Sequence, residues 1–219
     1  MRLIQCAQGE EAWHQLRSGR CTASRFFEAR SKLTRASKNG SAGDPSGDAI
    51  SYAWSVAIER VFGSTIDINQ QSAAMRRGTE LEPHARLAYE CETGYLASES
   101  GICVSDCERF AYSSDGLIDD DGMIEIKCPA APAKIGAIWS SPETAAAEYI
   151  DQIQGGMWIT GRKWCDFIMY CPWLEPVGKD LFVQRIHRDE AYIGDLEADL
   201  LSFWQMVEKF EGVLRKPKE

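Results

Sequence analysis

The sequence predicts a mixed α/β fold in which helices flank a central β-sheet. Apolar residues recur with helical spacing in much of the first 92 residues, and between 101 and 128 they alternate with polar residues in short runs. A helical segment, two more strand-like runs and a long amphipathic helix follow. This order is typical of a mixed sheet flanked by helices. The 219 residues, 44% of them hydrophobic, suffice for one domain over 1–219.

The N-terminal part of the chain is predicted to be helical. Helices are expected at 9–18, 22–33, about 48–62 and roughly 72–92. Thr22 is a suitable N-cap for the second of these helices. The segment 36–48 is rich in Gly, Ser and Asp, and we expect it to be a flexible loop. Pro83 predicts a kink or a new start within the fourth helix.

The remaining elements follow from a change of period. Short strands are expected near 101–105, 109–113, 123–128, 165–171 and 180–187. A helix is expected between about 143 and 160. Residues 189–214 form the closing amphipathic helix, because their apolar residues lie on one stripe.

Charge is distributed unevenly along the chain. The net charge of −9 argues against general affinity for nucleic acid, yet residues 1–38 hold eight basic and three acidic residues. This segment is either a solvated basic helix face or a local anion-binding surface, and composition does not choose between the two. If the second reading holds, the helices within 9–35 carry that surface.

The sequence contains no signal peptide and no run of 18 apolar residues, so neither secretion nor a membrane span is predicted. Eight cysteines lack the spacing of a disulfide scaffold. Cys103 and Cys107 have no second ligand pair, which argues against zinc. We therefore expect reduced thiols and a cytoplasmic location.

The segment 113-SSDGLIDDDGMIEIKCP-129 is predicted to form a hairpin that carries reactive groups. Side chains two apart in a strand share a face, so Glu125 and Lys127 point together, and Asp115 on the other arm can lie on their side. Two adjacent carboxylates repel unless a cation separates them, and Mg²⁺ prefers oxygen ligands. A lysine beside them can orient or deprotonate a water, or stabilise charge on a phosphate. Together these groups indicate phosphodiester hydrolysis.

Simpler interpretations exist for parts of this hairpin. A Glu-x-Lys alternation by itself is common on half-exposed strands. The acidic run Asp119–Asp121 is a solvated turn rather than a calcium loop, because Leu117 stands where a calcium loop needs an acidic residue. His14 and His84 have no partner at a metal-ligand or catalytic spacing, so we expect both to be structural or peripheral.

Asp115 followed by Glu125-Ile126-Lys127 is the D…(D/E)-x-K signature of restriction-endonuclease-like nucleases. SSDG and IEIKCP resemble, more closely, the family of phage lambda exonuclease and the YqaJ-like viral recombinases. Three further stretches agree in order and spacing: 12-AWHQLRSGRCTAS-24, 78-GTELEPHAR-86 and 149-YIDQIQGGMWIT-160. The resemblance runs from about residue 8 to residue 214, and it implies a restriction-endonuclease-like core.

The resemblance implies a role for each matching residue. The implied catalytic residues are Asp115, Glu125, Lys127, Glu82 and Gln152. Asp115, Glu125 and the backbone carbonyl of Ile126 would hold Mg²⁺, and Lys127 would activate the attacking water. Glu82 would assist at the metal, and Gln152 would lie beside the lysine.

The family's site for a 5′-terminal phosphate matches Arg17, Ser24 and Ser113. Arg17 offers a planar fork to a phosphate. Ser24 is expected in the first turn of its helix, where free N–H groups favour anions. Arg17 and Ser24 lie in the basic N-terminal segment, which would then be the surface that recognises DNA ends.

The resemblance implies a Mg²⁺-dependent 5′→3′ exonuclease that acts on double-stranded DNA, with two ions bound and Mn²⁺ able to replace them. It would release mononucleotides and leave a 3′ overhang for recombination by strand annealing. A ring-shaped homotrimer, a single-strand annealing partner and a phage or prophage gene in a bacterial host are also implied. Two alternatives stay open: an endonuclease or flap nuclease on the same fold, and a non-catalytic DNA-end-binding module. The intact set of Asp115, Glu125 and Lys127 argues against the module.

Overall fold

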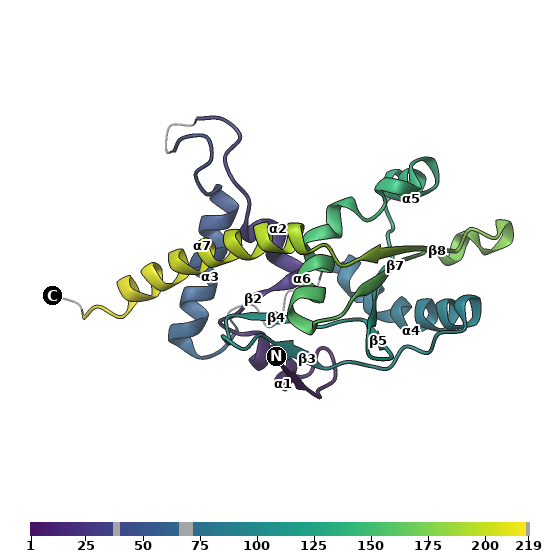
Figure 1. The fold of residues 1–219 in the computed structure, drawn as a ribbon, viewed down its shortest axis with the longest axis horizontal. Coiled ribbons are helices and arrows are strands. Elements are labelled where there is room, and N and C mark those ends of the chain that lie inside the picture. Colours follow the sequence, from purple (N-terminus) through teal and green to yellow (C-terminus); the bar gives the residue numbers. More distant parts are fainter. Residues whose placement is uncertain (37–39, 66–71, 218–219) are drawn as a thin grey trace. The chain divides into compact units, whose positions relative to one another are not determined.

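The computed structural model describes residues 1–36, 40–65 and 72–217, and it confirms the mixed α/β prediction (Figure 1). The strands form two four-stranded sheets, in the orders β1-β3-β4-β2 and β5-β6-β7-β8, where one central sheet was expected. The chain divides into two compact units. The first comprises Met1–Ile68, Gly101–Ser113 and Asp189–Glu219, and the second comprises Asn69–Ser100 and Ser114–Arg188. That the two act as a single nuclease domain stays a prediction.

The first unit combines a small sheet with two long helices. Its elements are β1 (Arg2–Ile4), α1 (Glu11–Arg17), β2 (Cys21–Thr22), η1 (Ala23–Arg25), α2 (Phe26–Ala29), α3 (Gly47–Phe62), β3 (Ile102–Val104), β4 (Phe110–Tyr112) and α7 (Glu190–Leu214). Ser46 caps α3 by accepting from the Ala49 N–H, and Gly63, in the left-handed region at φ 82°, ends it. Helix α3 packs against α7, which buries the predicted apolar stripe. The expected helices at about 48–62 and 189–214 are therefore confirmed.

The expected helix at 22–33 is wrong. The backbone of Cys21 and Thr22 pairs instead with β4 in a parallel ladder, which leaves a three-residue 3₁₀ turn and a four-residue helix. Thr22 makes no capping hydrogen bond, because its hydroxyl accepts from Arg17. Of the expected flexible loop 36–48, residues 37–39 lie outside the described residues. Beyond them, Leu33 exchanges backbone hydrogen bonds with Gly43 and Asp44, at 2.8 Å each.

The second unit contains the predicted hairpin. Its elements are α4 (Ala73–Thr93), β5 (Gly116–Ile118), β6 (Gly122–Lys127), α5 (Pro132–Ser140), η2 (Pro142–Thr144), η3 (Ala147–Tyr149), α6 (Ile150–Thr160), β7 (Trp164–Tyr170), η4 (Pro172–Val177) and β8 (Leu181–His187). Strands β5 and β6 pair antiparallel around the turn at 119–121, as expected. Strand β6 pairs parallel with β7, and β7 pairs antiparallel with β8.

Three details of the second unit differ from expectation. Helix α4 continues through Pro83, so no new helix starts there; Ser72 is its N-cap and Gly94 ends it. The helix expected from 143 begins only at Ile150, because the preceding residues form the 3₁₀ turns η2 and η3. Helix α5 was not expected, although Pro132 stands at a first-turn position that suits proline.

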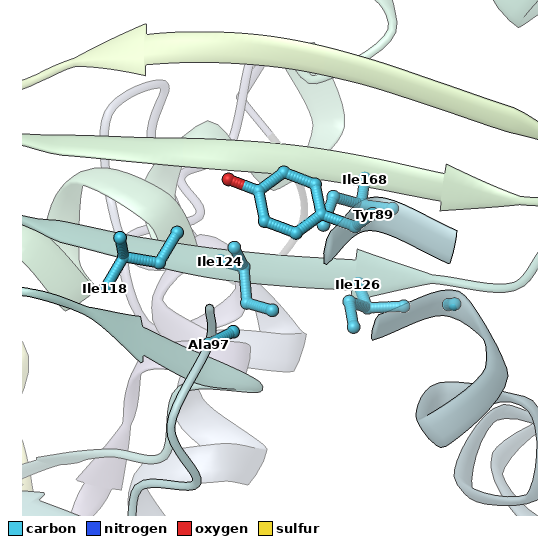
Figure 2. Packing of buried hydrophobic residues seen from close by; sticks show 7 residues of the cluster. Tyr89, Ala97, Ile118, Ile124, Ile126 and Ile168 are labelled. Atoms are coloured by element: carbon cyan, nitrogen blue, oxygen red, sulfur yellow. The ribbon is translucent and has the colours of Figure 1, made fainter. Parts of the chain in front are cut away.

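Helix α4 lies on one face of the second sheet, over a cluster of buried apolar side chains (Figure 2). The cluster consists of Ala85, Tyr89, Ala97, Ile118, Ile124, Ile126 and Ile168. The Tyr89 hydroxyl also donates to the Asp166 carboxylate at 2.6 Å. The Arg185 guanidinium donates two hydrogen bonds to the same buried carboxylate, at 2.8 and 2.7 Å. The Tyr89 contact helps to set the position of α4 along the sheet, because a shift of the helix would remove this hydrogen bond from a buried hydroxyl group.

The sequence predicted no membrane span and no disulfide scaffold. None of the described helices combines the length and apolar character that a membrane crossing requires. All eight cysteines are free thiols, and Cys91 and Cys107 are exposed.

We predict that Ile124→Ala lowers the free energy of unfolding by about 2 to 5 kcal/mol, because Ile124 is fully buried and its loss leaves a cavity. Leu87→Ala on α4 is the control, since Leu87 is 60% exposed, and it should change that free energy by about 0.5 kcal/mol or less. Urea denaturation followed by circular dichroism measures both. Equal effects of the two substitutions would contradict the placement of the core.

Candidate active site

Strand β6 carries a buried carboxylate, that of Glu125, and the lysine ammonium group that pairs with it. Glu125 is 1% exposed, and Lys127, two residues on and on the same face, donates its Nζ to Glu125 Oε1 at 2.6 Å. Gln152, in the first turn of α6, donates its Nε2 to the same oxygen at 2.6 Å. Three of the predicted site residues therefore meet at one buried atom.

Asp115 lies at the entry to the hairpin, against the same strand. Its Oδ2 accepts from the Ile126 N–H at 2.6 Å. The neighbouring Ser114 hydroxyl contacts the carbonyl oxygens of Gly116 and Ile124, at 2.7 and 3.1 Å, and so fastens β5 to β6. The alternation in β6 turns Ile126 into the core opposite Glu125 and Lys127, as expected.

Burial and neighbouring like charges destabilise the ionised forms of Asp115 and Glu82. Burial and the nearby Glu125 raise the pKa of Asp115 well above its ordinary value, and Lys127 opposes part of that rise. Burial also raises the pKa of Glu82, against the pull of Arg86 at 3.3 Å, and Glu125 adds to the rise. Glu125 and Asp115 outweigh desolvation at the ammonium and raise the pKa of Lys127. The structure thus brings Glu82 into the electrostatic field of the other acids.

This donor set fits a hard divalent cation. Asp115 and Glu125 supply carboxylate oxygens, and the main chain of Ile126 supplies a carbonyl, which are the ligand types that Mg²⁺ prefers. Burial and the repulsion from Glu125 raise the pKa of Asp115, and a bound cation would oppose both effects. In residues 1–36, 40–65 and 72–217, no three His, Cys, Asp or Glu side chains are arranged to hold an ion together. Glu125 is turned to Lys127 and Gln152 instead.

Tyr149 belongs to this site, although sequence reasoning did not identify it. Its ring centroid lies 5.2 Å from Lys127 Nζ, and the ring stacks on Phe167 at 5.2 Å. Its hydroxyl accepts from Lys134 Nζ at 3.4 Å. The available signal was its position three residues before Gln152, which places both side chains near the start of one helix.

The predicted phosphate-binding residues form a second group, in the first unit. Arg17 Nη2 donates to Ser24 Oγ at 3.4 Å and to Thr22 Oγ1 at 3.3 Å. Ser113 joins them through Trp13, whose indole N–H donates to the Ser113 hydroxyl at 3.3 Å and whose ring lies 4.3 Å from the Arg17 guanidinium carbon. Trp13 and Thr22 were not predicted to belong to this group.

The reason given for Ser24 is wrong, because Ser24 lies in a three-residue 3₁₀ turn followed by a four-residue helix, too short for a helix dipole to matter. Arg17 carries the group's charge instead. Burial lowers its pKa, and within the described parts of the chain no carboxylate lies within ion-pair distance of it. Other cations of the basic segment are already paired: Arg25 with Glu28, and Arg30 and Lys32 with Asp199.

Comparison with known proteins places this geometry in context. Residues 12–163 match the model of the YqaJ-like viral recombinase domain, a range that contains every predicted site residue. The structure is similar to that of LHK-Exo, an alkaline exonuclease from Laribacter hongkongensis. The two are 35% identical over 94% of this chain and 96% of that one, with a TM-score of 0.79. LHK-Exo in complex with dAMP matches over the same shares of both chains, also at 35% identity, with a TM-score of 0.80.

A phage-related exonuclease from Haemophilus somnus 129PT shares the fold, with a TM-score of 0.66 at 17% identity over 89% of this chain and 94% of that one. No curated protein matches the sequence.

We predict that Asp115→Asn stabilises the metal-free protein at neutral pH, because asparagine carries no charge that would have to be buried. The folded state raises the pKa of Asp115, so it binds that proton more tightly than the unfolded chain does. At a pH where the carboxylate is ionised, its charge therefore opposes folding. Asparagine removes the charge and keeps an acceptor for the Ile126 N–H.

The measurement is urea denaturation in EDTA, with Asp120→Asn in the exposed turn as the matched control. Added Mg²⁺ should stabilise the wild type more than Asp115→Asn. A loss of stability in Asp115→Asn without metal would contradict the proposed charge repulsion.

Proposed function

The chain belongs to the YqaJ-like viral recombinase family, and on that premise we propose that it is a metal-dependent nuclease that degrades double-stranded DNA from its 5′ ends. One observation carries the proposal: the buried Glu125 carboxylate is held by Lys127 and Gln152, beside Asp115. A buried carboxylate beside a lysine and a second carboxyl group contributes little to stability, since ionised groups in such a cluster destabilise the fold. It suits hydrolysis of a phosphodiester.

Asp115, Glu125 and the carbonyl of Ile126 would hold Mg²⁺, with Glu82 nearby for a second ion, and Mn²⁺ could replace both. Such ions, when bound, lower the pKa of a coordinated water and neutralise charge on the phosphate. Gln152 would keep the Glu125 carboxylate in one orientation through its amide N–H. Lys127 would orient the attacking water and stabilise charge on a phosphate oxygen, because its Nζ carries donors only while protonated.

Arg17, Ser24 and Ser113 would bind the 5′-terminal phosphate. The Arg17 guanidinium lacks a carboxylate partner in the described residues. It donates to the hydroxyls of Thr22 and Ser24, and Trp13, whose ring it contacts, donates to the Ser113 hydroxyl. A phosphate that binds a fork of N–H donors and hydroxyl groups gains strong, charge-assisted hydrogen bonds. A preference for 5′-phosphorylated ends follows from this assignment.

The products and partners of the reaction are proposed from family membership. Digestion in the 5′→3′ direction would release mononucleotides and leave a 3′ overhang, which a single-strand annealing protein would bind during recombination. One relative, LHK-Exo, forms a complex with dAMP, a nucleoside monophosphate of the kind such digestion releases. A ring-shaped homotrimer and a phage or prophage origin complete the proposal.

The first test is digestion of a linear duplex, with a closed circular plasmid in parallel. We expect mononucleotides from the 5′ ends of the linear DNA with Mg²⁺, no product with EDTA and no cutting of the circle. Lys127→Ala should lower kcat about 100-fold or more while DNA binding persists. Lys209→Ala, at an exposed position of α7, is the matched control and should leave kcat unchanged.

Each contrary result has a distinct meaning. Cutting of the closed circle would indicate an endonuclease, and full activity of Lys127→Ala would overturn the site. Binding of DNA ends with no degradation under any condition would indicate a non-catalytic module.

A second prediction concerns the 5′-phosphate. Arg17→Gln should reduce the preference for 5′-phosphorylated over 5′-hydroxyl duplex, measured as the ratio of kcat/KM values, by about 10- to 100-fold, because a hydrogen bond to a charged group is lost. Arg35→Gln makes the same change at an exposed position of the basic segment and should leave the ratio unaltered. An unchanged preference in Arg17→Gln would place the end-recognition site elsewhere.

A further inference from the structure

The strand that carries Lys127 ends at an edge of the second sheet where several other segments also end or begin. Strands β6 and β7 run parallel, with Lys127 opposite Met169, so their C-terminal ends share that edge. Helix α5 follows β6, and η4 follows β7. Strand β8 starts at the same edge, with Leu181 opposite Tyr170. Helix α5 and the turn η4 therefore begin near the same edge of the sheet, where β6 ends (Figure 1).

These segments pair cations with aromatic rings. The Arg77 guanidinium carbon lies 5.7 Å from the Trp173 ring centroid, and Lys179 Nζ lies 5.2 Å from that of Trp139. Trp139 lies in α5, Trp173 lies in η4, and Arg77 comes from the first turns of α4. Interleaved cations and aromatic rings are what a protein needs to bind single-stranded nucleic acid, because bases stack on the rings and phosphates pair with the cations.

Arg77 joins this group to the catalytic strand. Its Nη2 donates to the carbonyl oxygen of Cys128, the residue after Lys127, at 2.6 Å. Its Nε is buried, and among the described residues it has no hydrogen-bond partner. A buried donor without an acceptor is costly, so the contacts within the described residues do not by themselves account for an arginine at this position.

Trp173 is 55% exposed, although it is one of the largest apolar side chains in the second unit. A purely structural role explains the bond from Arg77 to Cys128, but it explains neither the exposed indole nor the unpartnered Nε. Charge near Trp173 is mixed, since Glu175 in η4 is exposed as well. Stacking of a base therefore has to supply a large part of the binding energy.

We propose that Trp173 and Arg77 form a subsite for single-stranded DNA beside the catalytic strand. An unpaired base stacks on the Trp173 indole, and the adjoining phosphate binds Arg77, with Lys179 and Trp139 as the next positions along the strand. Single-stranded rather than duplex DNA is favoured, because a paired base inside a duplex has no free face for the ring. The inference rests on the proposed function, since it places this strand next to Lys127.

The test measures binding without chemistry. Fluorescence anisotropy of a labelled 12-nucleotide oligo-dT is followed in EDTA, so that no strand is degraded. Trp173→Ala should weaken binding roughly 5- to 100-fold, the range expected for the loss of one stacked base. Trp173→Phe keeps an aromatic face and should retain most of the affinity. Phe62→Ala removes an even more exposed ring, in the first unit, and should leave the affinity for oligo-dT unchanged.

Salt dependence tests the phosphate contact separately. Arg77→Gln should reduce the slope of log affinity against log salt by about one, whereas Arg77→Lys, which keeps the charge, should not. If Arg77→Gln fails to fold, the Trp173 variants still test the subsite, because Trp173 is exposed and its replacement should not prevent folding. Unchanged oligo-dT affinity in Trp173→Ala would overturn the subsite. Equal losses for oligo-dT and for a blunt duplex would overturn its single-strand character.

The same variants are assayed with Mg²⁺ and linear duplex. Digestion by the wild type, with unaltered oligo-dT binding in Trp173→Ala, would leave the proposed nuclease standing and remove only this inference. Trp173-dependent binding in a wild type that degrades no DNA would support the subsite and overturn the proposed nuclease.

Discussion

The second unit depends on how one buried carboxylate, that of Glu125, is held by its hydrogen-bond partners. Removing a carboxylate from water costs more than most single contacts return, so it needs partners with good geometry. Lys127 and Gln152 both donate to the same oxygen, which ties β6 to the first turn of α6. Asp115 and Glu82 lie close enough to Glu125 for it to raise the pKa of both, in addition to the effect of burial. Three carboxyl groups gathered in this way destabilise the fold when they are ionised, and a bound cation would relieve that cost.

The parts of the fold that follow from side-chain period could be predicted. Alternation in 123–128 placed Ile126 in the core and Glu125 with Lys127 on the other face, and the structure agrees. The segment 22–33 could not be read this way, because its start is fixed by a backbone ladder to β4, some 90 residues away. Helix α5 was missed because its nine residues carry few polar side chains that mark a face.

The candidate site was predictable in its charged residues and not in its aromatic ones. Asp115 and Glu125 were recognised from their spacing in the predicted hairpin and from the D…(D/E)-x-K signature, and Arg17 from the family resemblance. Trp13 and Tyr149 look like ordinary packing residues in sequence, and only their contacts with Arg17 and Lys127 show that they order the reactive groups. Which cations of the basic N-terminal segment are paired could not be predicted from the sequence, because Arg30 and Lys32 pair with Asp199, 167 or more residues away.

The tie between Tyr89, Asp166 and Arg185 has an evolutionary consequence. Loss of Asp166 alone would leave a buried hydroxyl and a guanidinium without their acceptor, and loss of Arg185 alone would leave a buried carboxylate without its cation. A variant that has lost only one of these side chains is therefore less stable than the chain with all three or a chain in which all three are replaced. Lineages should keep the trio or replace it as a set, so that these three positions covary.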